Sequence, residues 1–133
     1  MRNFHYYAAM AAALMCVSCK STTTGLANQS YALTELNGTP LQTINEAPSI
    51  TFANGRVNAT VGCNQIMADY TVGKDGKLTF AMGAMTKMYC PDEMREDEFV
   101  AAFNKVARYV VSADGKEVSF LDQQGNVLFK AKK

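Results

Sequence analysis

Apolar and polar side chains alternate in short runs from Tyr31 onward, and turn-forming residues follow each run. A period of two places every second side chain on the same face of a strand, so the pattern predicts antiparallel β-sheet. The clearest signal is Asn54-Gly55 between the runs 49–53 and 56–61, because these two residues accept the positive φ angles of a type I′ hairpin turn. Further strands are predicted at residues 31–36, 66–72, 77–80, 109–113, 118–120 and 127–130.

The periodicity changes after Pro91. Phe99, Phe103 and Val106 recur at i, i+4 and i+7, which forms one apolar stripe on a helix. Charged residues flank the stripe in the order that the helix dipole favours, acidic before it and basic near its end: Asp92, Glu93, Lys105 and Arg108. The chain therefore predicts a mainly β fold, a small antiparallel β-barrel-like domain of about eight strands with one α-helix.

The first residues have the order of a bacterial secretory signal. Arg2 precedes an apolar run over residues 6–17, which is shorter than the about 20 apolar residues that a membrane-spanning helix needs. Small residues then lead to Cys19, as in a bacterial lipobox, although Cys16 stands where leucine is usual. We expect Cys19 to become the lipidated first residue of the mature protein. The alternative is plain secretion, with Cys19 an ordinary thiol.

Lipidation of Cys19 would divide the chain into three parts and fix its location. These are a signal peptide at residues 1–18, the lipidated cysteine with a flexible tether at residues 19–29, and a folded domain at residues 30–133. More than one acyl chain anchors a protein stably, so the expected location is the cell envelope. Lys20 stands where an aspartate retains some lipoproteins in the inner membrane, which favours the outer membrane.

The nearly equal numbers of positive and negative residues limit the classes of partner that the sequence predicts. The chain has 13 Lys and Arg residues against 12 Asp and Glu residues, so no strong net field draws it to nucleic acid. The expected partners are the membrane, through the N-terminal lipid, and an unidentified envelope protein.

The four cysteines have different expected roles, according to their positions in the chain. Cys16 leaves with the signal and Cys19 takes the lipid, so Cys63 and Cys90 remain as a pair in an oxidising compartment. We expect them to form a disulfide that contributes about 3 to 4 kcal/mol to stability. The alternative is two separate buried thiols.

Several kinds of catalytic site are missing from the sequence. The sole histidine is His5, inside the signal, so the mature chain cannot build a Ser-His-Asp or Cys-His nucleophile or an imidazole zinc site. No glycine-rich phosphate loop is present. The carboxylates at residues 92–98 could hold calcium, but such a run is typical of a solvated helix face. We expect no enzyme activity, no cofactor and no metal site.

Two ligand-binding alternatives remain open. Met82, Met85 and Met88 recur every third residue with Cys90 beyond them, and thioether sulfurs select Cu(I). The competing interpretation is that flexible methionines fill gaps in an irregular core. The second alternative is a small apolar ligand inside the barrel, unless side chains fill that space.

A set of short motifs carries a resemblance to a known family. In order along the chain they are Gly62-Cys63-Asn64, Tyr70, Thr86-x-Met88-x-Cys90, Glu96 with Phe99, and Tyr109 before a closing hairpin. Over residues 31–133 the chain resembles the META/HslJ family, although that family usually has Trp, Gly and Ala where Tyr31, Ala68 and Tyr89 stand. The resemblance implies a small antiparallel barrel-like fold with one helix, often carried by envelope lipoproteins, and no defined molecular activity.

The Gly-Cys-Asn motif has an architectural explanation. Gly62 accepts backbone angles closed to other residues, and Asn64 can bond its own backbone in a turn, so Gly62, Cys63 and Asn64 are expected to form a strand corner. The function expected from the whole sequence is that of a non-enzymatic envelope lipoprotein supporting envelope integrity or stress tolerance. The alternative is a carrier or sensor of a small apolar ligand or Cu(I).

Overall fold

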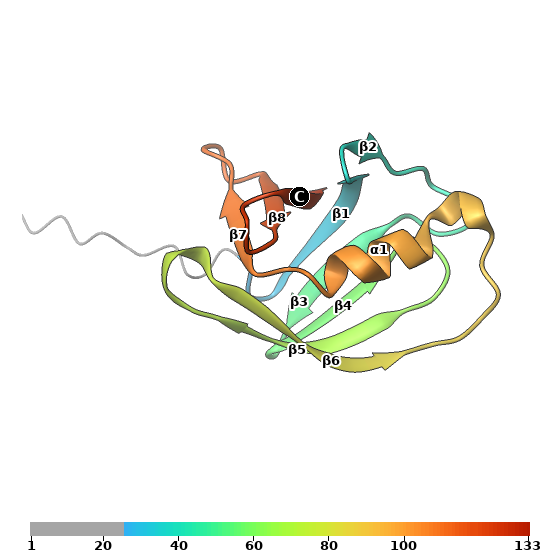
Figure 1. Cartoon of the computed structure of the whole chain (residues 1–133), viewed down its shortest axis with the longest axis horizontal. Coiled ribbons are helices and arrows are strands. Elements are labelled where there is room, and N and C mark those ends of the chain that lie inside the picture. The colour runs from blue at the N-terminus through green and yellow to red at the C-terminus, as the bar shows by residue number, and fades with distance from the viewer. Residues whose placement is uncertain (1–25) are drawn as a thin grey trace, which may run out of the picture.

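A computed structural model describes residues 26–133, except for the side chain of Met82 (Figure 1). The predicted signal peptide, Cys19 and most of the predicted tether lie outside the described residues. The elements are β1 Gln29–Leu36, β2 Thr39–Pro40, β3 Ser49–Ala53, β4 Arg56–Thr60, β5 Ile66–Val72, β6 Leu78–Met85, α1 Glu96–Phe103, β7 Arg108–Val111, β8 Glu117–Leu121 and β9 Val127–Lys132. Two 3₁₀ turns, Lys74–Gly76 and Asp92–Met94, lie before β6 and before α1.

The strands form one antiparallel sheet in the order β6-β5-β4-β3-β1-β9-β8-β7, with the short β2 paired to β1. The two ends of the sheet meet next to β6 and β7, through the bridge between Lys77 and Arg108. Beside that bridge the Leu78 N–H donates to the Ala107 carbonyl at 3.0 Å. The sheet is therefore a nearly closed barrel, which confirms the predicted fold of about eight main strands and one helix.

The hairpin turns follow from asparagine and glycine pairs. Asn54 and Gly55 have φ angles of 53° and 75° and join β3 to β4, as the sequence predicts. Asn37 and Gly38, with φ angles of 48° and 82°, make the same kind of turn between β1 and β2.

Strand β6 is longer than predicted and ends at Met85 instead of residue 80. Met67 pairs with Ala84 and Asp69 pairs with Ala81, so two residues of β6 oppose one residue of β5 in a β-bulge. Gly83 lies in this bulge, close against the backbone of Met67, where a larger residue would collide. The bulge interrupts the alternation that the prediction relied on.

Helix α1 is shorter than predicted and ends at Phe103. Lys105 lies beyond the helix and Arg108 begins β7, so the predicted interaction of these two cations with the helix dipole is wrong. The chain leaves the helix early because the Ala107 N–H must reach the Leu121 carbonyl of β8, at 2.9 Å. Asp92 and Glu93, predicted to begin the helix, lie before it in the 3₁₀ turn Asp92–Met94, and the acidic residues of the first turn of α1 are Glu96, Asp97 and Glu98.

Phenylalanine side chains fill the interior of the barrel. Phe52 lies with its ring centroid 6.2 Å from that of Phe120, and Phe120 stacks on Phe129 at 4.7 Å. The helix adds Phe99, 5.1 Å from Phe129, and Phe103, 4.4 Å from Phe80 of β6. Because these rings occupy the centre, a small apolar ligand would have to displace packed side chains to enter it.

The N-terminal boundary of the folded domain lies earlier than predicted. Leu26 is fully buried in the core and β1 begins at Gln29, so residues 26–29 belong to the domain and not to a structureless tether. Within residues 26–133, the structure contains no helix with the length and apolarity needed to cross a bilayer.

Candidate functional site

The segment between β6 and α1, residues 86–95, passes over one end of the barrel and is called the crossing loop below (Figure 1). It contains the Thr-x-Met-x-Cys motif and faces the Gly62-Cys63-Asn64 corner that follows β4. A disulfide, one buried asparagine and one arginine hold the crossing loop in place.

Asn64 is the centre of a buried hydrogen-bond network. Its Oδ1 accepts hydrogen bonds from the Thr86 hydroxyl at 3.0 Å and from the Met88 backbone N–H at 2.7 Å. Its Nδ2 donates to the Met88 carbonyl at 3.1 Å. The Thr86 hydroxyl also accepts from the Gln65 N–H at 2.9 Å. The motif residues Thr86 and Met88 are thus explained by one partner, and Met88 takes part through its backbone alone.

Asn64 also fixes Glu96 at the start of α1. The Asn64 backbone N–H donates to Glu96 Oε1 and its side-chain Nδ2 donates to Oε2, both at 2.8 Å. Glu96 is only 9% exposed. Buried carboxylates are stable when donors of this kind satisfy their oxygens. Sequence reasoning missed this role because a glutamate within an acidic run is typical of a solvated helix face.

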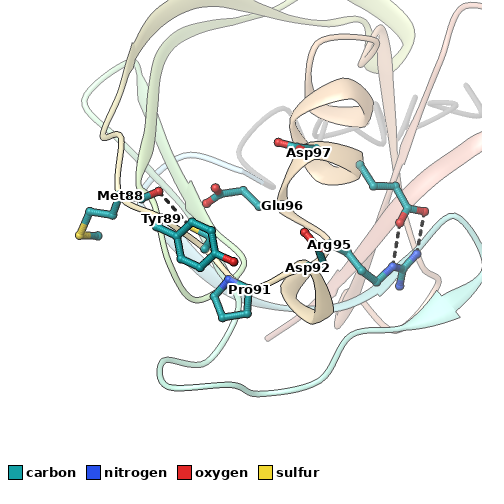
Figure 2. A pocket seen from close by; sticks show the side chains of 9 residues that line it. Met88, Tyr89, Pro91, Asp92, Arg95, Glu96 and Asp97 are labelled. Atoms are coloured by element: carbon teal, nitrogen blue, oxygen red, sulfur yellow. Dashed lines mark hydrogen bonds and ion pairs between the residues drawn. The ribbon is translucent and has the colours of Figure 1, made fainter.

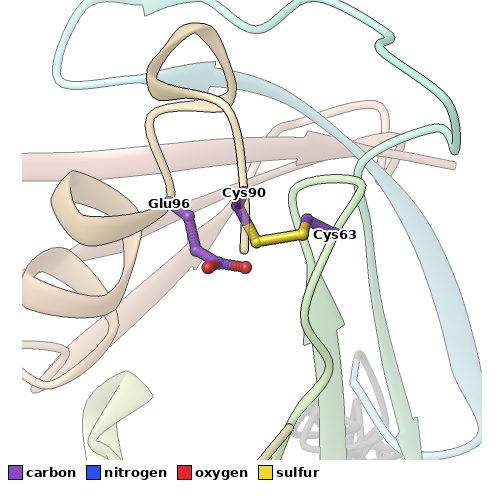
Figure 3. A group of neighbouring side chains, drawn as sticks. All are labelled: Cys63, Cys90 and Glu96. Carbon is purple, nitrogen blue, oxygen red and sulfur yellow. A yellow bond between two sulfur atoms is a disulfide. The ribbon is translucent and has the colours of Figure 1, made fainter. Parts of the chain in front are cut away.

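Cys63 and Cys90 form a disulfide beside the Glu96 carboxylate (Figure 3). Their Cα atoms are 6.0 Å apart, and the two residues are separated by 27 positions in sequence. The disulfide prediction is confirmed, and the alternative of two separate thiols does not hold. Each sulfur and one Glu96 oxygen lie within 4.8 Å of one another.

Gly62 makes the strand corner that the sequence predicts. Its φ angle is 115°, and its N–H donates to the Thr60 hydroxyl at 2.9 Å. A Cβ atom at this position would lie 2.7 Å from the Glu46 carbonyl oxygen and 2.8 Å from that of Ile44. For Asn64 the predicted bond to its own backbone in a turn is wrong, because its side chain reaches across to the crossing loop and Glu96.

Replacing Gly62 with alanine should lower the free energy of unfolding by about 2 kcal/mol, since the backbone must move to relieve both the positive φ angle and the clash. Gly55→Ala is the matched control, because Gly55 also has a positive φ angle but nothing within 4 Å of the added Cβ. The Gly55→Ala substitution should lower the free energy of unfolding by about 1 kcal/mol. Urea unfolding of both variants measures the difference, and equal losses would contradict the steric explanation.

Arg95 ties the crossing loop to the β1–β2 hairpin. Its φ angle of 55° places it in the left-handed region immediately before α1. Its guanidinium donates to the Leu36 carbonyl at 2.9 Å. It also donates to both oxygens of Glu98 at 2.8 Å (Figure 2). Glu98 also accepts from the Asn37 side chain at 3.0 Å. The spacing of Arg95 and Glu98, three residues apart at a helix start, was the one sequence signal for this pair.

These contacts change the acidity of Glu98. The Arg95 hydrogen bond, and next the Asn37 hydrogen bond, lower the pKa of the Glu98 carboxyl to about 2. Because the pKa is lower in the folded state, Glu98 stabilises the fold above its unfolded pKa of about 4.3, and that contribution is lost as the pH falls through about 2.

Glu98→Gln should therefore be less stable than the native chain at pH 7, and the two should converge as the pH approaches 2. The Glu98 side chain is 40% exposed, so solvent screening limits the difference at pH 7 to about 1 kcal/mol. Urea unfolding at several pH values measures it. A difference that stays constant from pH 7 to pH 2 would show that the ionisation of Glu98 is not the cause.

An open, mostly polar groove of about 400 Å³ lies between the crossing loop and the start of α1 (Figure 2). Tyr89 is 93% exposed and Met88 is 60% exposed at its edge. The groove is lined by Met88, Tyr89, Cys90, Pro91, Asp92, Arg95, Glu96, Asp97 and Glu98. The predicted solvated carboxylate run is thus only partly correct, since Asp92, Glu93 and Asp97 are exposed whereas Glu96 and Glu98 have specific partners.

The methionine series does not converge in the part of it that the structure describes. Met85 packs against the core and lines a small apolar cavity of about 170 Å³ between β5, β6 and α1. Met88 instead lines the polar groove. Cys90 is bonded to Cys63 and offers no thiolate. The side chain of Met82 lies outside the description.

The chain is similar to a known protein family and to three solved structures. The family model described as META domain matches residues 24–133. Three solved structures are similar. An NMR structure of a protein from Burkholderia xenovorans has a TM-score of 0.63 at 22% identity, covering 83% of this chain and 85% of that one. A second NMR structure has a TM-score of 0.65 at 19% identity, covering 82% and 92%.

The third is a crystal structure of a DUF4847 family protein from Bacteroides vulgatus, with a TM-score of 0.60 at 16% identity, covering 80% of this chain and 93% of that one. No curated protein matches the chain. At these identities the three structures support the fold alone.

Proposed function

Because the chain belongs to the META domain family, we propose that it is a non-enzymatic, lipid-anchored protein of the bacterial cell envelope that supports envelope integrity or stress tolerance by binding another envelope protein through the crossing loop. Cys19 would carry the lipid and hold the domain at the outer membrane. The crossing loop would then be the surface presented to the partner.

The observation that carries this proposal is the exposure of Tyr89 and Met88 on a loop that is otherwise held rigid. Met88 uses its backbone in the Asn64 network, so its side chain is free of that structural role and 60% exposed. Tyr89 is 93% exposed on the next position. Exposed aromatic and methionine side chains on a preorganised loop are typical of the anchors of protein interfaces, since little conformational entropy is lost on binding.

Crosslinking in intact cells tests the proposal. A photoreactive amino acid at position 89 should give a discrete adduct with one envelope protein. The same group at position 110 is the control, because Val110 is 51% exposed on β7, away from the crossing loop. Identical adducts at both positions, or none at position 89, would count against the crossing loop as the binding surface.

The lipid anchor has its own test. Metabolic labelling with a fatty acid should mark the native protein and not Cys19→Ala, and the labelled protein should fractionate with the outer membrane. An unlabelled native protein would contradict the anchor while leaving the crosslinking result to stand by itself.

A further inference from the structure

Cys63, Cys90 and Glu96 bring two sulfurs and one carboxylate oxygen within 4.8 Å of one another, from three separate parts of the chain (Figure 3). In the oxidised protein the two sulfurs are bonded and cannot act as thiolates. Reduction changes this donor set, because two thiolates and one carboxylate are ligands that zinc accepts in tetrahedral sites.

We propose that the reduced form of this domain binds one zinc ion through Cys63, Cys90 and Glu96, with water as the fourth ligand. A dithiol reductant passes two electrons to the disulfide, forming its own disulfide and leaving two thiols on the protein. Each thiol then loses its proton as zinc binds, so that two protons are released for each ion.

The backbone already suits such a site. Cysteines whose Cα atoms are 6.0 Å apart reach one ion by rotation of their side chains, since each Zn–S bond is about 2.3 Å long. The corner at Gly62 and the Asn64 network hold the two cysteine-bearing segments independently of the disulfide. The cysteines therefore stay close when the bond between them is broken.

Glu96 is oriented by the groups around it. The two N–H donors of Asn64 each bond one of its oxygens at 2.8 Å, which fixes the plane of the carboxylate beside the sulfurs. Each oxygen keeps a second lone pair for a metal, and such outer hydrogen bonds are what orient ligands in known metal sites. Cys90 and Glu96 also line the open groove, from which water can supply the fourth ligand.

The donor set favours zinc over copper. Cu(I) prefers thiolates and thioethers, whereas zinc also accepts a carboxylate oxygen. In the reduced form, bound zinc would replace the disulfide as the link between the corner at Cys63 and the crossing loop. The domain would then keep the crossing loop in place under reducing conditions, which is a property separate from the proposed partner binding.

The test is a zinc titration of the full chain in detergent, carrying Cys16→Ser and Cys19→Ser so that Cys63 and Cys90 are its sole cysteines. A phosphine reduces the disulfide without offering a competing thiolate, and calorimetry measures binding at pH 7. The reduced chain should bind one zinc ion at least tenfold more tightly than the oxidised chain. Cobalt in place of zinc should give the thiolate-to-cobalt absorption of a tetrahedral site.

Variants identify the ligands. Adding Cys63→Ser with Cys90→Ser should abolish the site, and Glu96→Gln should weaken zinc binding at least tenfold. Glu93→Gln, at an exposed carboxylate that does not line the groove, should not change zinc binding. Equal zinc affinity in the reduced chain and the serine variant would overturn the proposal, as would full affinity in Glu96→Gln. Circular dichroism follows the fold throughout. If reduction unfolds the chain, zinc should restore the fold, and a failure to do so would also overturn the proposal.

Discussion

Replacing Cys63 and Cys90 together with serine should lower the free energy of unfolding by about 3.5 kcal/mol. The disulfide joins residues 27 positions apart, and removing a link of that span returns about this much entropy to the unfolded chain. Small domains have total stabilities of about 5 to 15 kcal/mol, so the loss is a large share of the whole. Urea unfolding of the variant and the oxidised native chain measures it.

The matched control is the native chain under a reductant in zinc-free buffer, which should unfold at nearly the same urea concentration as the serine variant. Agreement between these two urea concentrations would show that the serine side chains do not themselves destabilise the fold. If the serine variant unfolds together with the oxidised native chain, the disulfide does not contribute to stability as we expect.

Replacing Asn64 with alanine should lower the free energy of unfolding by about 3 kcal/mol, although the change removes only one small side chain. The change deprives the Met88 N–H and the Thr86 hydroxyl of their acceptor and takes one donor from the buried carboxylate of Glu96. Unsatisfied buried polar groups cost about 1 to 3 kcal/mol each, and partial relaxation of the crossing loop toward water limits the sum. Urea unfolding again gives the free energy.

Two further variants separate the network from a general effect of losing an asparagine. Asn58→Ala, at an exposed position of β4, should change stability by less than about 0.5 kcal/mol. Asn64→Asp keeps the shape but places a second carboxylate against Glu96, so it should be at least as harmful as alanine at pH 7. An Asn64→Ala variant as stable as Asn58→Ala would contradict the central role of Asn64.

The elements that local chemistry decides were predictable from the sequence. The Asn54-Gly55 turn sets its own backbone angles, and alternation in β3 and β4 places Ile50, Phe52 and Val57 in the core. The disulfide was predicted from the small number of cysteines that lie outside the predicted signal and lipidation site, and the family motifs agree with the family match over residues 24–133.

The parts that long-range contacts decide were not predictable. Asn64 bonds partners 22 to 32 residues away, and no local pattern distinguishes those bonds from the ordinary turn role of an asparagine. The same holds for Glu96, whose burial depends on Asn64 and not on its neighbours in sequence. The end of α1 was misplaced because pairing of Ala107 with β8, and not helix propensity, decides where the helix stops.

Only part of the candidate site could be predicted from the sequence. The motif residues were identified, but the sequence assigned no role to Thr86, and in the structure Thr86 and Met88 hold the crossing loop by bonding Asn64 through a hydroxyl and a backbone amide. The groove beside them exists because Arg95 and Glu96 hold the start of α1 at two points, one toward the β1–β2 hairpin and one toward Asn64.

The position of β9 has a consequence for how the domain folds. This strand lies between β1 and β8 in the sheet, and Ala32 near the start of the domain pairs with Lys132 near its end. The central pairing thus joins residues about a hundred positions apart, a topology of high contact order that slows folding. An emerging chain leaves one edge of β1 unpaired until β9 has been synthesised, and during that time the edge is exposed to aggregation.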